Sequence, residues 1–163
     1  KNDIDKQSSA KKHLDAGTKG VEAIEDLVER VRLLGKLARF YVKIGKDQEA
    51  KTTIQSALNL ADAEKDAGKK ATLLIQIAGE QMGSLKDRPS GIATLTEAQT
   101  LAGTLKENPN RQANLMIDIA QVYNNTGQKP KARELLDSAE KICRGRSECK
   151  PAMKRIEKVR DKM

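Results

Sequence analysis

The chain has 163 residues, one domain's worth of sequence and enough to bury roughly 70% of the surface of the unfolded chain. Aromatic residues make up only 2% of it, with no Trp and one Phe, so the core must consist of Leu, Ile, Val and Ala, as in close-packed helices. No apolar run approaches the ~18 residues that a membrane-spanning helix needs, and we expect no membrane span.

The net charge of +8 is concentrated at the C-terminal end of the chain. The last twenty residues carry eight basic and three acidic side chains, a net charge of +5. Such a segment either forms the solubilising face of a terminal helix or binds a polyanion. Nucleic acid is the weaker expectation, because there are almost no aromatic side chains on which bases could stack.

The first part of the chain predicts a long helix. Residues 1–18 carry only a few apolar side chains at helical spacing and form either a capping helix or a loosely attached segment. From Val21 to Ile44, apolar residues recur every three or four positions, which predicts one uninterrupted amphipathic helix that stops at Gly45. A helix of this length, with no turn where a preceding repeat should end, would project and recruit another copy of the chain.

Helical patterns continue to the C-terminus. Two further helices are predicted from about Asp47 to Asp66 and from about Lys69 to Met82, the second stopping at Gly83. Four later helices begin with a proline in their first turn, where its missing N–H costs nothing; these are Pro89, Pro109, Pro130 and Pro151. The last helix has one apolar and one charged face, as the end of a helical stack requires.

An internal repeat with a period near forty residues organises these helices. The first copy contains Leu34, Leu37, Ala38, Tyr41, Gly45, Ala50, Ile54 and Ala57. The last copy repeats every interval with Met116, Ile119, Ala120, Tyr123, Gly127, Ala132, Leu136 and Ala139. The middle copy is looser and contains Leu74, Ile77, Ala78, Gln81, Gly91, Leu95 and Ala98. A fixed period of this length is typical of stacked supersecondary units.

This pattern resembles the tetratricopeptide repeat. In that family the first helix of each pair carries a large apolar residue, a Leu followed by a small residue, and an aromatic residue before a Gly stop, and the second helix carries small and apolar residues at matching intervals. The resemblance covers about residues 31–144. The chain departs from the family in its period of 40–42 rather than ~34, in lacking the opening Trp and the closing Pro, and in having Gln81 where an aromatic residue is expected.

The resemblance implies an all-α fold, a right-handed stack of antiparallel helix pairs (an α-solenoid) with about seven to eight helices. Residues 1–163 would form a single domain. Residues 1–30 would be an N-terminal capping segment with the start of the long helix, residues 31–144 three helix pairs, and residues 147–163 a C-terminal capping helix.

The family also implies where a partner would bind, because the first helix of each pair lines a concave groove. The matched positions of this chain are Arg32, Gly35, Arg39, Lys43, Thr72, Gly79, Asn114, Gln121 and Asn124. Their hydrogen-bond donors suit an extended peptide with acidic groups or a free C-terminal carboxylate. We therefore expect a non-catalytic scaffold or adaptor for another protein. In the alternative, Arg32, Arg39 and Lys43 only form a solvated face and pair with acidic residues of the chain itself. Self-assembly into a homo-oligomer is the alternative function, and polyanion binding through the C-terminal helix is the third.

Catalysis is not expected. One His, two Cys and scattered carboxylates provide no arrangement of nucleophile and base, and no Gly-rich phosphate loop is present, so neither an enzyme nor a cofactor is predicted. A metal site is not expected either, because two sulfurs are too few ligands and His13 is far from them in sequence.

Cys143 and Cys149 flank a predicted turn between the last repeat and the final helix. They form either a disulfide across this corner, which would imply an exported or periplasmic protein, or two free thiols, as in a cytoplasmic one. A disulfide here would stabilise the fold only modestly, because a short loop removes little entropy from the unfolded chain.

Overall fold

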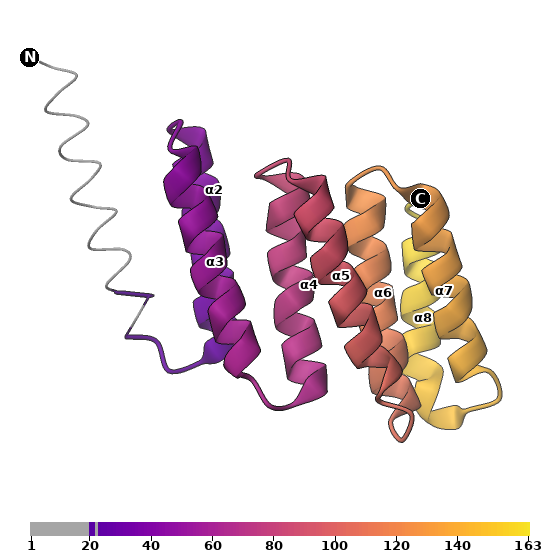
Figure 1. The fold of residues 1–163 in the computed structure, drawn as a ribbon. Coiled ribbons are helices and arrows are strands. Elements are labelled where there is room, and N and C mark those ends of the chain that lie inside the picture. Colours follow the sequence, from indigo (N-terminus) through magenta and orange to yellow (C-terminus); the bar gives the residue numbers. More distant parts are fainter. Residues whose placement is uncertain (1–19, 22) are drawn as a thin grey trace, which may run out of the picture.

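The computed structural model describes residues 20, 21 and 23–163, and this part of the chain contains helices but no strands (Figure 1). Its helices are α2 (Leu27–Lys43), α3 (Asp47–Ala63), α4 (Ala67–Gly83), α5 (Arg88–Gly103), α6 (Pro109–Asn125), α7 (Lys129–Cys143), the short 3₁₀ helix η1 (Ser147–Cys149) and α8 (Lys150–Arg160). The prediction of an all-α fold with about seven to eight helices is confirmed. Most of the predicted capping segment, residues 1–19, lies outside the described residues.

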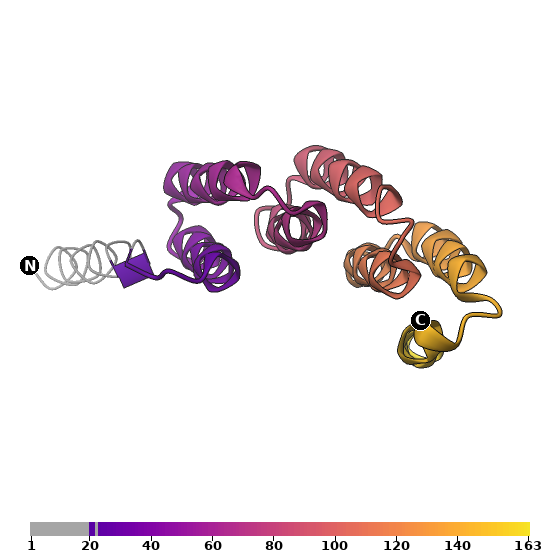
Figure 2. The ribbon, with the colours of Figure 1, turned by 90° about the horizontal axis from the view of Figure 1, so that it is seen from below.

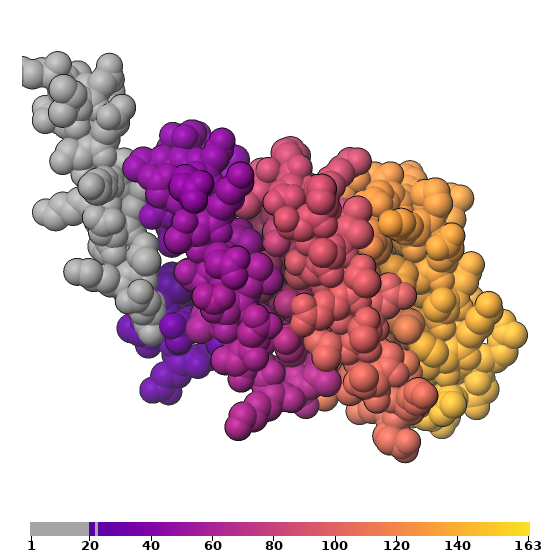
Figure 3. Space-filling view, in the orientation of Figure 1, coloured from indigo at the N-terminus to yellow at the C-terminus, as the bar shows by residue number. Residues whose placement is uncertain are grey.

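The helices pack as consecutive pairs, α2 with α3, α4 with α5 and α6 with α7. The first helix of each pair also contacts the first helix of the next pair, and α6 contacts α8 in the same way. Viewed along the helix axes, α2, α4, α6 and α8 form the inner row of an arc and α3, α5 and α7 the outer row (Figure 2). Figure 3 shows the molecule from the side of the outer row.

Small residues set the spacing within each pair. Ala38 of α2 and Ala50 of α3 are completely buried, so the two helix backbones approach closely. In the middle pair Gly91 of α5 stands where the first copy has Ala50. A Cβ atom at Gly91 would lie 2.1 Å from the Cγ atom of buried Met82, so the larger Met82 occupies the space that an alanine side chain would need.

The predicted helix from Val21 to Ile44 is wrong at its N-terminal end. Residues 24–26 are not helical, and α2 begins after Asp26, whose carboxylate accepts a hydrogen bond from the Glu29 backbone N–H at 2.9 Å. The apolar spacing continues through this break, which is why periodicity alone predicts one helix. Asp26 followed three residues later by Glu29 is the sequence signal for a helix start. The helix α2 is therefore shorter than the long projecting helix that was expected to recruit another copy of the chain.

Most other helix ends agree with the turn residues of the sequence, but α3 ends at Ala63, and Asp66, which was expected to end it, is instead the N-cap of α4. A proline lies in the first turn of each of α5, α6, α7 and α8, as predicted. Gly45 and Gly127 follow α2 and α6 with positive φ angles of 72° and 82°, whereas the equivalent corner after α4 places Lys86 at a φ of 59°. None of the helices in the described chain is long and apolar enough to cross a membrane.

Candidate functional site

The nine predicted groove residues all belong to the inner row. Four lie on α2 (Arg32, Gly35, Arg39, Lys43), two on α4 (Thr72, Gly79) and three on α6 (Asn114, Gln121, Asn124). The structure differs from the expectation in what several of these residues contact, because some of them bind neighbouring helices.

Arg39 connects the first two inner helices. Its guanidinium donates to the carboxylate of Glu80 on α4, with Nε 3.3 Å from Oε2, and the Ser84 hydroxyl donates to the same carboxylate at 2.6 Å. The hydrogen bond to Glu80 raises the pKa of the Arg39 guanidinium. Because the Glu80 side chain is only 17% exposed, this ion pair is part of the contact between α2 and α4 as well as of the surface.

The two glycines of the predicted groove differ in their surroundings. Gly35 is buried, and a Cβ atom there would lie 3.0 Å from the Cγ atom of Glu80, so the missing side chain makes room for the neighbouring helix. Gly79 is half-buried, and a Cβ atom there would meet only Val122, at 3.9 Å. Of the two, only Gly79 leaves space beside it.

Gln81, at the irregular position of the middle copy, is 5% exposed and belongs to the core.

Asn114 takes part in the last inner contact. Its side-chain amide donates to the Asn110 carbonyl oxygen at 2.8 Å, and its Oδ1 accepts from the guanidinium of Arg155 on α8. Arg155 also forms an ion pair with Asp118 of α6. The predicted groove donor is therefore engaged in holding the capping helix.

The remaining predicted residues divide into paired and open ones. Arg32 forms an ion pair with Glu29 on its own helix, and the Thr72 hydroxyl donates to the Gly68 carbonyl at 2.9 Å. Within the described chain, the side chains of Lys43, Gln121 and Asn124 have neither an ion pair nor a hydrogen bond, so these three are the open polar groups among the nine predicted residues.

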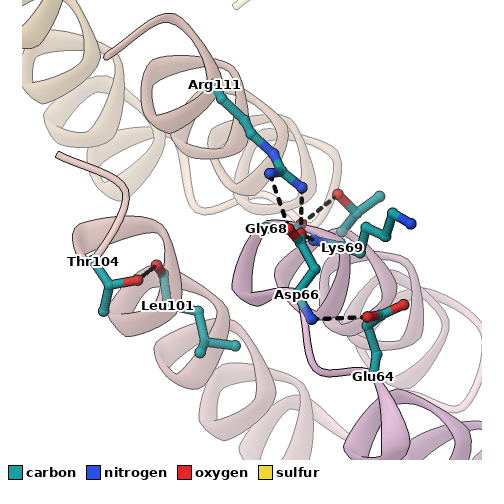
Figure 4. A network of polar contacts seen from close by, with 8 residues as sticks. Glu64, Asp66, Gly68, Lys69, Leu101, Thr104 and Arg111 are labelled. Atoms are coloured by element: carbon teal, nitrogen blue, oxygen red, sulfur yellow. Dashed lines mark hydrogen bonds and ion pairs between the residues drawn. The ribbon is translucent and has the colours of Figure 1, made fainter. Parts of the chain in front are cut away.

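A link between α4 and α6 was not predicted (Figure 4). Asp66 caps α4 by accepting from the Lys69 backbone N–H at 2.6 Å, and its carboxylate pairs with the guanidinium of Arg111 on α6. The hydrogen bond from Arg111 lowers the pKa of the Asp66 carboxyl, with the Lys69 N–H as the second cause. Arg39, Arg111 and Arg155 thus each join two inner helices. The apolar repeat carries no signal for these links, although Asp66 is recognisable as an N-cap residue.

A hollow next to the first of these links lies between α2, α3 and α4. It has a volume of about 260 Å³, with apolar walls that include Val31, Ile54 and Ile77 and with Arg32 and Glu80 among its polar lining residues. The side-chain oxygen of Gln76, another lining residue, is buried and has no hydrogen-bond donor in the structure. The hollow therefore offers an apolar surface and one unused acceptor.

The two cysteines meet at the corner between α7 and α8. Both are buried free thiols within hydrogen-bonding reach of each other, so the predicted bridge is not formed in the structure although the partners are adjacent. Burial is the main cause that raises the pKa of Cys143 to about 12, and the contact with Cys149 adds to it.

The paired helices and the small residues between them agree with the architecture that the tetratricopeptide resemblance implies. No family model, no curated protein and no solved structure matches the chain.

Proposed function

We propose that this protein is a non-catalytic adaptor that holds an extended acidic peptide of a partner protein against α2, α4 and α6. The observation that carries the proposal is that three donors of the predicted groove are open, Lys43 on α2 and Gln121 and Asn124 on α6. An extended peptide has backbone carbonyls and acidic side chains that such donors bind. Stacked helical repeats present surfaces of this kind.

The charge of α2 favours an acidic partner. Arg32, Lys36, Arg39 and Lys43 are exposed on this helix, and Glu29 and Glu80 pair with only two of them. The hollow of about 260 Å³ beside Arg32 is suited to one apolar side chain of the peptide. The unused oxygen of Gln76 in its lining would accept an N–H of the ligand.

Selection from a displayed random peptide library tests this proposal. We expect enrichment of acidic peptides, and loss of their binding in the double variant Lys43→Ala with Gln121→Ala. The matched control is Lys51→Ala with Gln48→Ala, which removes the same two residue types from the outer helix α3, where both are exposed. Equal binding by the two double variants, or no enrichment of acidic sequences, would contradict the proposal.

Self-association is a second candidate, favoured by the apolar surface of α2. The exposed large hydrophobic side chains of the described chain are Val28, Phe40 and Ile44, with exposed fractions of 37%, 45% and 40%. All three lie on α2 or at its C-cap, at the first end of the stack, and Phe40 is the one Phe of the sequence. A second copy packed on this end would cover them.

Light scattering at several protein concentrations separates the two candidates. Self-association predicts a dimer mass that Phe40→Glu reduces to that of a monomer, without loss of helical circular dichroism. A monomer mass at every concentration would overturn it while leaving the peptide proposal intact.

In this proposal, the redox state of the two cysteines indicates the cellular location of the protein. A Cys143–Cys149 disulfide would belong to an exported or periplasmic adaptor, and free thiols to a cytoplasmic one.

A further inference from the structure

The basic side chains near the C-terminus fall into two groups. Arg155 pairs with Asp118, and Arg160 pairs with both Asp137 and Glu140, so these two arginines hold α8 against α6 and α7. A second group is exposed and makes no ion pair with any described residue; it consists of Arg144, Arg146, Lys150, Lys154, Lys158 and Lys162. The positive charge of the C-terminal region is therefore partly structural and partly unused.

Four of these unused cations, Arg144, Arg146, Lys150 and Lys154, line one hollow. It lies at the corner where α7 ends and α8 begins, it has a volume of about 670 Å³, and its other lining residues include Cys143 and Met153. Two carboxylates, Glu140 and Glu157, also line it. Glu140 is already paired with Arg160, so Glu157 is the one carboxylate of the lining that has no ion pair among the described residues.

This arrangement leaves an excess of positive charge in a concave surface. Four like charges around one hollow repel each other, and a concave wall strengthens their common field at its centre. A ligand with several negative groups removes this repulsion and gains an ion pair at each cation. The volume of the hollow lies within the range found for small-ligand sites, so it can hold a short segment of a peptide.

We propose that this corner hollow binds an extended peptide segment that carries several anionic side groups, either carboxylates or phosphates. None of its lining residues is aromatic, so it has no platform on which nucleic-acid bases could stack. Met153 gives the hollow an adaptable apolar contact for the stem of a peptide side chain. The site uses α7 and α8 and none of the residues of the inner-row proposal, so each can fail without the other.

Fluorescence anisotropy of the 163-residue chain with fluorescein-labelled oligoglutamate and oligophosphoserine tests the proposal. We expect binding to at least one peptide, which weakens as salt is added. The triple variant Arg144→Gln, Arg146→Gln, Lys150→Gln should bind about tenfold more weakly, since the loss of each exposed cation should weaken binding about twofold. All three positions are exposed, and circular dichroism checks that the variant retains its helices.

A charge-matched control separates a local site from general attraction to a basic protein. The variant Lys51→Gln, Lys65→Gln, Lys106→Gln removes three exposed lysines elsewhere, so both triple variants change the net charge from +8 to +5 (8 − 3). We expect the control to bind within about twofold of the original chain. An equal loss in both triple variants would show that only the total charge matters and would overturn the proposal.

A third variant predicts a change in the opposite direction. Glu157→Gln removes the unpaired carboxylate of the hollow and should tighten binding about threefold. The peptide that binds more tightly identifies carboxylate or phosphate as the source of the anion. Binding of neither peptide, or tighter binding of a single-stranded oligothymidylate than of both, would overturn the assignment to an anionic peptide.

Discussion

The side chain of Arg111 extends from α6 to Asp66 at the start of α4, and its guanidinium lies directly across Gly68 (Figure 4). A Cβ atom on Gly68 would be 2.3 Å from the Cζ atom of Arg111, so no other residue at this position is compatible with the observed path of the arginine. One missing side chain in the first turn of a helix thus permits a contact between two repeats.

We therefore expect Gly68→Ala to change the pKa of the Asp66 carboxyl while leaving the helical fold in place. The displaced atoms belong to the end of a flexible side chain, so Arg111 can swing away, and alanine favours the helix. Without Arg111, the pKa of Asp66 should rise toward its ordinary value, because the largest cause of its depression is removed. Side-chain NMR titration measures this pKa, and thermal unfolding measures the stability.

The sign of the pH effect follows from the direction of that shift. A carboxyl whose pKa is lower in the folded state stabilises the fold above its unfolded pKa, and this contribution disappears as the pH falls through the folded value. Gly68→Ala should reduce the part of the unfolding free energy that is lost on acidification. Gly103→Ala serves as the control, because a Cβ atom there meets nothing within 4 Å. An unchanged Asp66 pKa in Gly68→Ala would show that Arg111 does not need the space.

The substitution Gly91→Ala should be strongly destabilising. The added Cβ atom would collide with buried Met82 and would come within 3.3 Å of the Ala78 carbonyl oxygen, which cannot move aside. Overpacking of this kind costs about 1–3 kcal/mol of unfolding free energy, measurable by urea denaturation. The first repeat has Val42 and Ala50 at the equivalent positions, so Met82→Val should restore part of the loss in the double variant.

A double-mutant cycle decides whether Met82 and Gly91 are a matched pair. Coupling is expected because each single change disturbs a shared contact, whereas the double variant recreates the sizes found in the first repeat. If the two single losses simply add, Gly91 is required for another reason, such as the contact with the Ala78 backbone.

Loss of the Asp26 cap should shorten α2 at its N-terminus. Asp26→Ala leaves the Glu29 backbone N–H without its partner and should cost about 1 kcal/mol in the free energy of unfolding. Asp26→Ser keeps an acceptor at this position and should cost little. Equal losses for Ala and Ser would indicate that the side chain of Asp26 contributes through its charge and not through the cap.

The thiols at the α7–α8 corner should form a disulfide under oxidising conditions. The non-reduced protein would then weigh about two protons less than the reduced one, because each thiol loses one hydrogen. The high pKa of Cys143, about 12, leaves little thiolate at neutral pH, so the reaction with glutathione disulfide should accelerate as the pH rises. Mass spectrometry after timed oxidation measures it, with Cys149→Ala as the control that cannot close the bridge.

The helical architecture could be predicted from the sequence because it depends on local patterns. The apolar repeat identifies the pairs, and the prolines at the starts of α5 to α8 identify their boundaries. The break before Leu27 was missed because the apolar period continues past it, and a cap depends on one polar side chain at one position.

The candidate site was less predictable, because it depends on how the helices are set against each other. Arg39 was expected in the groove as a free donor, but the register of α2 against α4 places it beside Glu80. The same register buries Gly35. A sequence repeat gives the positions that face a neighbouring helix but not the distance along the axis at which two side chains meet.

Three of the arginine ion pairs join inner helices to one another, and Arg160 joins α8 to the outer helix α7. Arg39, Arg111 and Arg155 connect inner helices, while consecutive outer helices have few contacts with one another or none in the described chain. The outer helices are held through the inner row, because Lys70 of α4 pairs with Asp62 of α3 and with Glu97 of α5. A ligand that binds two inner helices at once would span the same row that these arginines connect, so its affinity should depend on the spacing between neighbouring repeats.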